Sequence, residues 1–207
     1  IAAPDAVRAH LEAGAQRARI EAGAAGRVAE TPKPGDACFA RVDNRVIGGA
    51  KDALAAVATR LAAAGVGVFN LGEIEGDALK VARDHAALIR QKLADTPRPF
   101  ALVSGGETTV EVVPGSGRGG RNTTYLLALG DALKGVENVW ALAADSDGID
   151  GTEDNAGALW TPASAAPDAA DFLARRDAYA WFERAGGLVV TGPTRTNVND
   201  LRMVLLA

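Results

Sequence analysis

Residues Phe100–Thr109 read FALVSGGETT, an apolar run that passes directly into a loop of small and polar residues. The same arrangement occurs twice more, where Val139–Ala144 runs into Asp145–Gly151 and where Leu188–Val190 runs into Thr191–Thr194. Short apolar runs bounded by turn residues are typical of buried strands. Ligands of open sheets bind beyond the carboxyl ends of the strands, so these three segments predict one composite site. The alternative is three ordinary surface turns, because Gly, Pro and Asp dominate turns.

Helix and strand patterns alternate along the chain. The predicted helices cover residues 4–21, 51–64, 77–94, 122–133 and 169–185, and the predicted strands cover residues 38–47, 66–71, 100–103, 109–113, 139–144 and 188–190. Apolar residues at three- and four-residue spacing indicate the helices, and short apolar or alternating runs indicate the strands. This order predicts an α/β or α+β fold, with a mixed, largely parallel sheet flanked by helices.

The segment Thr96–Pro99 contains two prolines in four residues. Proline fixes its own φ and biases the preceding residue away from the helix, so the upstream helix ends here. We therefore expect a domain boundary between residues 96 and 97. With 207 residues, the chain has room for one large or two small domains.

The composition is that of a globular protein and excludes several classes. A formal net charge of −4, without a Lys- or Arg-rich run, gives no sign of a nucleic-acid partner. No apolar stretch approaches the roughly 18–20 residues of a membrane-spanning helix, and the start at Ile1 lacks a secretory signal pattern. Because Cys38 is the single cysteine, no internal disulfide is expected, and a cytoplasmic setting follows.

A glycine-rich segment, Gly115–Asn122, leads into the helix predicted from Asn122. Free backbone N–H groups and the helix dipole at such a start favour an anion. Arg118 and Arg121 add positive charge, and a guanidinium presents paired donors to phosphate oxygens. The segment therefore predicts phosphate binding, and its alternative is a flexible hairpin with solvated arginines.

The same segment formally satisfies the dinucleotide pattern G-x-G-x-x-G at Gly115, Gly117 and Gly120. The preceding strand is not continuously apolar, Pro114 adjoins the first glycine, and Asp145 follows later than the usual acidic residue. A reductase that uses NADH or NADPH is therefore the second interpretation.

Four aspartates, Asp145, Asp147, Asp150 and Asp154, lie within ten residues. One or two of their carboxylates, together with phosphate oxygens, could hold Mg²⁺. The spacing is not that of an EF-hand, which needs a glycine at its sixth position and a glutamate at its twelfth. The alternatives are a base acting on a substrate hydroxyl, or aspartates that only cap and solvate the loop.

Other catalytic patterns do not occur in the sequence. It contains neither the G-x-S-x-G of serine hydrolases nor the G-x-x-x-x-G-K-[ST] of P-loop kinases. His10 and His85 are too far apart to build a zinc site together, and we expect His85 to be a packing or surface residue.

Four motifs in this order resemble the C-terminal MOFRL domain of glycerate kinases, a family also widely labelled as hydroxypyruvate reductases of the tartrate-utilisation type. They are Ser104–Val110, Gly117–Asn122, Asp145–Gly151 and Thr191–Leu201. Residues 97–207 are similar to the MOFRL domain, and residues 1–96 look like the last part of the Rossmann-like domain that precedes it.

The resemblance implies ATP-dependent phosphorylation of D-glycerate, usually at the 2-hydroxyl, with Mg²⁺ in a cleft between two domains. Arg121, Glu107 and Asp147 would be the catalytic residues, with Asp145 and Asp147 at the metal. The residues implied in substrate or ATP binding are Ser104, Gly105, Gly106, Thr108, Gly117, Arg118, Gly119, Gly120, Asn122, Thr194, Asn197 and Asn199.

Two positions depart from the family pattern: Ser146 stands where Thr is frequent, and Thr124 where an acidic residue is expected. Family members are about twice as long, and their N-terminal portion supplies a lysine and further substrate loops. This chain is therefore expected to be an incomplete enzyme whose main partner is the missing portion of the same protein. A homodimer is one option, and a noncatalytic folding or assembly module is the third interpretation.

Overall fold

The computed structural model describes residues 25–26, 31–164 and 168–207. The chain divides into two compact units, residues 1–45 and residues 46–207. In the described part of the first unit, Ala37–Phe39 form a short 3-10 helix, η1. The helix expected over residues 4–21 lies outside the described residues.

The strand predicted over residues 38–47 is wrong. None of these residues is in a strand, and Val46 and Ile47, which belong to the second unit, are 90% and 98% exposed. A strand needs a pairing partner to satisfy its backbone groups. The β-favouring residues of this segment do not supply one.

The second unit contains a six-stranded sheet in the order β1-β3-β8-β5-β6-β7. Its strands are β1 (Gly67–Glu73), β3 (Phe100–Gly105), β5 (Val139–Asp145), β6 (Gly157–Trp160), β7 (Leu188–Val189) and β8 (Asp200–Leu206). A separate parallel pair joins β2 (Gly76–Asp77) to β4 (Thr108–Thr109). Strand β1 runs parallel to β3, and the remaining neighbours in the large sheet are antiparallel.

These pairings give β1, β3, β5 and β7 one common direction, against which β6 and β8 run. The expected mixed sheet is thereby confirmed, with four of its six strands running in one direction. The carboxyl ends of β3, β5 and β7 lie at one edge, and β8 begins at that same edge. The loops after the three quoted apolar runs therefore gather as predicted.

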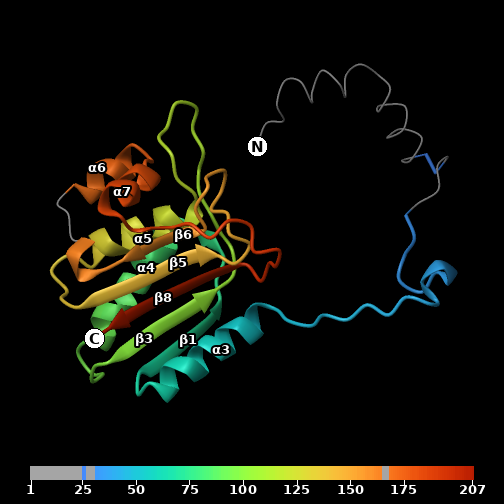
Figure 1. Cartoon of the computed structure of the whole chain (residues 1–207), viewed down its shortest axis with the longest axis horizontal. Helices are drawn as coiled ribbons and strands as arrows, with labels where there is room; N and C mark the ends of the chain where they lie inside the picture. Colours follow the sequence, from blue (N-terminus) through green and yellow to red (C-terminus); the bar gives the residue numbers. More distant parts are fainter. Residues whose placement is uncertain (1–24, 27–30, 165–167) are drawn as a thin grey trace. The chain divides into compact units, whose positions relative to one another are not determined.

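Helices cover both faces of the sheet (Figure 1). Helix α3 (Ala50–Ala63) packs on β1 and β3 from one side, and α4 (Ala78–Lys92) and α5 (Arg121–Ala132) lie on the other. Two short helices, α6 (Ala169–Ala174) and α7 (Ala178–Ala185), pack against α5. A 3-10 turn, η2, covers Pro162–Ser164. No helix among the described residues is long and apolar enough to cross a membrane.

Helix α4 shows why this sequence is helical. The Asp77 side chain caps its first turn by accepting from the Lys80 N–H at 2.8 Å. Its buried residues recur every three or four positions along one face: Ala78, Val81, Ala82, His85, Ala86 and Ile89. That face packs on α5 and shares one core cluster with Phe100 and Leu102 of β3, an interior strand that is buried along its whole length.

Two further expected elements differ in the structure. The helix predicted over residues 169–185 is two helices, because Arg176 adopts a left-handed φ of 54° between them. Of the strand predicted over residues 109–113, Thr109 alone is in a strand, as the second residue of β4 (Thr108–Thr109). Strands β2, β6 and β8 were not predicted.

The expected domain boundary between residues 96 and 97 stays a prediction. In the structure this position lies inside the second unit, between α4 and β3. Strands from either side of it, β1 and β3, pair directly in register from Gly67–Phe100 onward.

Candidate functional site

The loop-bearing edge of the sheet brings together charged residues from three elements. Asp145 ends β5, Asp200 begins β8, and the two are directly opposite in the antiparallel register. Arg121 is the first residue of α5. Two carboxylates facing each other across a ladder repel, so the guanidinium between them supplies the charge that stabilises this edge.

Arg121 is bound by three carboxylates. Its Nε donates to both oxygens of Asp200 at 3.0 Å, its Nη2 pairs with Asp145, and its Nη1 lies 3.5 Å from Oε1 of Glu107. The Arg121 side chain is 19% exposed, whereas that of Glu107 is 58% exposed. Burial opposes the guanidinium charge, but the hydrogen bond and charge of Asp200, with Asp145 and Glu107, raise the pKa of Arg121.

Asp145 is committed to this cluster. Its side chain is 2% exposed, it pairs with Arg121, and its Oδ1 accepts from the Asp147 N–H at 3.0 Å. Burial raises the pKa of the Asp145 carboxyl, and the Asp147 N–H and Arg121 partly oppose that shift. Asp145 thus pairs with Arg121 from the buried side of the guanidinium.

The N-terminus of α5 receives an anion, but that anion is the protein's own Asp150. The Asn122 N–H donates to Asp150 Oδ1, and the Thr123 N–H and hydroxyl donate to Oδ2, each at 2.9 Å. Asp150 is fully buried. A Cβ on Gly120 would overlap its carboxylate. The expectation that these N–H groups are free for a phosphate is therefore wrong.

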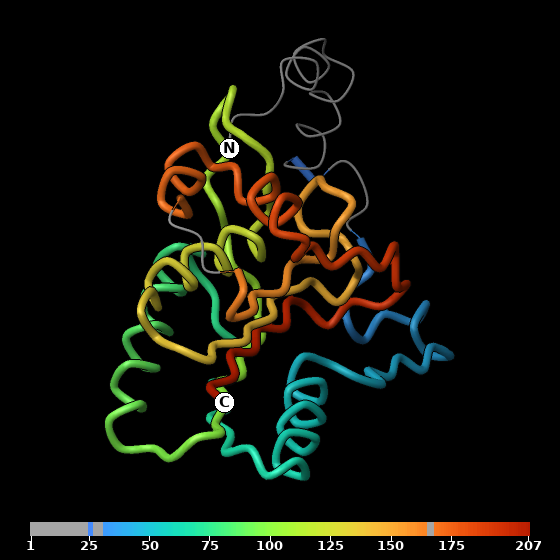
Figure 2. Tube along the Cα trace, turned by 60° about the vertical axis from the view of Figure 1, so that its left-hand side comes forward, coloured from blue at the N-terminus to red at the C-terminus, as the bar shows by residue number. Residues whose placement is uncertain are grey.

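Arg118 is held away from Arg121 by its own partners. Its Nε donates to Glu153 at 2.9 Å, and its guanidinium lies 3.8 Å from the ring centre of Tyr179. The Arg118 N–H and carbonyl bond Asp177 and Tyr179 as well. The glycine-rich segment, which extends beyond the sheet edge in Figures 1 and 2, is thereby tied to the start of α7.

The loop before β8 folds onto the aspartate loop. Thr194 donates through its N–H to the Asp147 carbonyl at 2.9 Å and through its hydroxyl to the Ser146 carbonyl. Asn197 Nδ2 lies 3.4 Å from Asp147 Oδ2, and the Asn199 carbonyl accepts from the Ser146 N–H at 3.2 Å. The structure therefore groups Thr194, Asn197 and Asn199 with Asp147, as the composite site requires.

The remaining residues of the expected set also lie at this edge. Ser104 and Gly105 end β3, and Thr108 begins β4. Gly106 has a φ of 89°, and a Cβ there would lie 2.6 Å from the Ile74 N atom, so the position needs glycine. A Cβ on Gly117 would overlap the Asp177 side chain, and a Cβ on Gly119 would lie 3.3 Å from the Tyr179 N atom.

Within the described parts of the chain, no three His, Cys, Asp or Glu side chains are grouped to hold a metal. Asp145 is taken by Arg121 and by the Asp147 N–H. Asp147 is half-buried, and its Oδ1 accepts from the Ile149 N–H at 2.9 Å. These residues do not fit a protein-only Mg²⁺ site, because Asp147 alone would be left as a carboxylate ligand.

Two buried residues of this cluster were not predicted. Asp200 and Arg202 are 2% and 1% exposed, and they share the inward face of β8 with Val204 and Leu206. Asp200 lies within the motif Thr191–Leu201 but no role was predicted for it, and Arg202 lies just beyond that motif. The available signal was the alternation DLRMVLL, which places a charged pair on one face of a strand.

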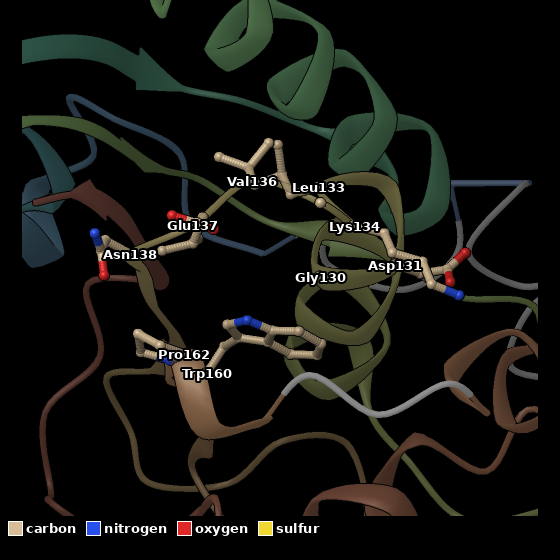
Figure 3. Close-up of a pocket in the computed structure, with 11 residues that line it drawn as sticks. Gly130, Asp131, Leu133, Lys134, Val136, Glu137, Asn138, Trp160 and Pro162 are labelled. Carbon is tan, nitrogen blue, oxygen red and sulfur yellow. The ribbon is translucent and has the colours of Figure 1, made fainter.

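Two cavities lie near opposite ends of α5. One of about 250 Å³ is lined by the glycine-rich segment, including Ser116, Gly117 and Arg118, and by Thr124 of α5. The other, of about 570 Å³, lies where α5 ends and β5 begins, with Trp160 beside Gly130 (Figure 3). Its lining holds none of the predicted site residues.

Comparisons with known proteins agree on one family. Residues 100–200 match the MOFRL family model. A protein of Agrobacterium vitis, carrying a provisional hydroxypyruvate reductase name, is 43% identical over 188 residues, which cover 86% of this chain and 42% of that protein. The glycerate 2-kinase of Pyrococcus horikoshii is 30% identical over 214 residues, covering 98% of this chain and 46% of the kinase.

A solved structure shares the fold. The crystal structure of glycerate kinase from Thermotoga maritima superimposes with a TM-score of 0.73 at 32% identity, over 80% of this chain and 42% of that one. The chain thus spans less than half of the length of these relatives.

Proposed function

We propose, from the premise that the chain belongs to the MOFRL family through residues 100–200, that it is the C-terminal part of a glycerate 2-kinase. The proposed reaction is transfer of the γ-phosphoryl group of ATP to the 2-hydroxyl of D-glycerate. The observation that carries this proposal is the cluster around Arg121, at the loop-bearing edge of a fold similar to that of a glycerate kinase. The rest of the active site is proposed to come from the region that the relatives have and this chain lacks.

The exposure of Glu107 supports a place for an anionic ligand. Asp200 and Asp145 hold Arg121 from the buried side, whereas Glu107 approaches Nη1 from the exposed side at 3.5 Å. A carboxylate of glycerate or a phosphoryl oxygen could take the Nη1 donors from Glu107 at small cost, because exposed ion pairs are weak. We propose that Arg121 binds this anion and that the released Glu107 orients the substrate hydroxyl.

The transfer requires little covalent chemistry from the protein. The hydroxyl oxygen forms a bond to the γ-phosphorus, the bond to the β–γ bridging oxygen breaks, and the hydroxyl proton leaves to a nearby base. Positioning and electrostatic stabilisation supply most of the catalysis in such reactions. Arg121 would stabilise the charge, and Asp147, with Asn197 and Thr194 around it, would form the adjacent wall.

We propose that Mg²⁺ comes with the nucleotide instead of being held beforehand. When bound, the ion would neutralise phosphate charge. Mg²⁺ is commonly bound by one or two carboxylates together with substrate phosphates. Asp147 would be its contact on this chain, because Asp145 is paired with Arg121. A cytoplasmic location is part of the proposal and rests on the single cysteine.

The test is an assay of ADP release with ATP, Mg²⁺ and D-glycerate, on the complete gene product that contains these 207 residues. We expect ADP release that Arg121→Ala lowers by at least about a hundredfold, the scale for loss of one charge-stabilising donor. Failure of the unmodified protein to release ADP would contradict the kinase. Full activity of Arg121→Ala would instead favour a noncatalytic role for this half.

Oxidation of NADH or NADPH by hydroxypyruvate is the matching assay for the alternative. The name of the Agrobacterium vitis relative favours this activity. The occupied N-terminus of α5 does not, because a dinucleotide pyrophosphate needs the N–H groups that Asp150 accepts from.

A further inference from the structure

We infer that Arg202, acting through Asp200, is a positioning residue that holds the Arg121 guanidinium in its working orientation. The consequence for catalysis rests on the proposed function, in which Arg121 binds the reacting anion. The geometric part of the inference does not, because it concerns contacts among residues of this chain alone.

The buried Arg202 side chain donates hydrogen bonds to several segments at the loop-bearing edge of the sheet. Its Nε donates to the Ser104 hydroxyl at 3.2 Å, and its Nη2 donates to the carbonyls of Gly105 and of Ile74, the latter at 3.0 Å. Its Nη1 lies 3.5 Å from the Thr108 hydroxyl. These partners belong to the end of β3, the loop after β1 and the start of β4.

The same guanidinium reaches Asp200, with Nη1 at 3.5 Å from Oδ2. Asp200 in turn accepts the Arg121 Nε on both of its oxygens at 3.0 Å and Asn122 Nδ2 on Oδ1 at 2.9 Å. Its carboxylate therefore lies between two arginines, and its side chain is fully buried. Because the Arg121 Nε–H donates to both oxygens of this fixed carboxylate, the plane of the Arg121 guanidinium is held in one orientation.

Burial excludes direct chemistry for Arg202. The residue is 1% exposed and lies beneath Ser104, Gly105 and Thr108, so it does not reach a ligand at the loop edge. Burying a second arginine is costly unless it is fully paired, and this one is paired with carbonyls, hydroxyls and a carboxylate. The arrangement is suited to fixing Asp200 relative to three loops.

The first test follows the Arg121 Nε–H itself, by hydrogen exchange in NMR spectra of the 207-residue chain. The variants are Arg202→Met and Arg202→Lys. The matched control is Arg98→Met, which removes an exposed arginine that also donates to two backbone carbonyls, those of Glu137 and Ala207. We expect Arg202→Met to speed Arg121 Nε–H exchange by about tenfold or more, with backbone protection of β3 retained.

Arg202→Lys should recover part of the protection, because an ammonium can keep a contact to Asp200 but cannot span all the partners. Arg98→Met should leave the Arg121 signal unchanged. Exchange of Arg121 Nε–H within twofold of the parent in folded Arg202→Met would overturn the inference. Loss of the fold in both Arg202 variants would also overturn it, and would assign Arg202 to stability.

The second test measures ADP release by the complete gene product. We expect Arg202→Met to lower kcat/KM by about a hundredfold, the scale of a misplaced catalytic group, and Arg202→Lys to regain about tenfold of it. Absence of kinase activity in the unmodified protein would contradict the proposed function. The positioning role of Arg202 would then still be decided by the Arg121 Nε–H exchange experiment. Unchanged kcat/KM with altered exchange would overturn the catalytic consequence.

Discussion

The two ends of α5 face different surroundings. The N-terminal end, at Arg121–Thr123, is surrounded by buried charges, with Asp150 on its N–H groups and Asp145 and Asp200 on Arg121. The C-terminal end, at Gly130–Leu133, borders the 570 Å³ cavity beside Trp160. The larger cavity is thus at the end away from the Arg121 cluster, so volume and buried charge favour opposite ends of this helix as the site.

The largest expected stability effect is at the charged end. Asp150→Ala removes the acceptor of two helix N–H groups and the Thr123 hydroxyl, all buried. Loss of a helix cap and of charge-assisted hydrogen bonds should lower the free energy of unfolding by about 3 kcal/mol, measured by urea denaturation. The control Asp154→Ala, an exposed aspartate that bonds Tyr179, should cost about 1 kcal/mol or less. Equal effects of the two substitutions would contradict the capping role.

The middle of α5 contacts a buried histidine of α4. His85 contacts the Tyr125 hydroxyl at 2.8 Å, and burial, aided by Arg202, lowers the pKa of His85 to about 4. The unfolded chain binds a proton near pH 6.5. Stability should therefore be constant with respect to this group above pH 6.5 and fall as pH drops from 6.5 to about 4, by about 3 kcal/mol in total.

The measurement is the difference in unfolding free energy between the parent and His85→Gln across that pH range. The subtraction removes the carboxylates, which titrate in both proteins. A difference that does not change between pH 7 and pH 4 would show that folding leaves the pKa of His85 unshifted.

At the C-terminal end of α5, we expect a smaller effect on stability, and one of unusual sign. Gly to Ala within a helix ordinarily stabilises by up to about 1 kcal/mol. A Cβ on Gly130 would overlap the Trp160 ring, so Gly130→Ala should instead destabilise by about 2 kcal/mol in thermal or urea unfolding. In a Trp160→Leu background, adding Gly130→Ala should cost less unfolding free energy than it does in the parent, because the smaller Leu leaves room for the Cβ. A stabilised single variant would mean that Trp160 moves aside freely.

The smallest effect concerns the second arginine at the charged end. The Arg118 side chain is 53% exposed and pairs with Glu153, so Arg118→Ala should change the free energy of unfolding less than any of the substitutions above, because exposed ion pairs are weak. In the ADP assay it should retain most of the activity that Arg121→Ala loses. A loss equal to that of Arg121→Ala would show that Arg118 leaves Glu153 and Tyr179 to bind the ligand.

Most elements could be predicted because their patterns are local. Apolar spacing located α3, α4, α5, β1, β3 and β5 to within a few residues. Strand β8 was missed because its buried face begins with two charged residues, Asp200 and Arg202, before Val204 and Leu206, so the apolar pattern of a buried strand is broken at its start. The break between α6 and α7 depends on one left-handed residue, Arg176, which no spacing reveals.

The candidate site was predicted as a set of loops, and its internal connections were not. The sequence placed Asp145, Asp147, Thr194 and Asn197 in loops after strands, and these loops do meet. It did not show that Arg118 pairs with Glu153, or that Arg121 lies among three carboxylates. Such pairings join residues 14 to 79 positions apart along the chain, and their geometry exists only after the strands are aligned.

By itself, the amino-acid sequence determined the alternation of strands and helices, and hence one edge where the polar loops gather, because periodicity and turn chemistry act over a few residues. Tertiary structure alone decided which charge meets which. Asp150 became the cap of α5 instead of a ligand for metal, and Asp200 became the carboxylate shared by Arg121 and Arg202. The physical reason is that a buried charge takes the nearest complementary group, and nearness is set by sheet register and helix placement.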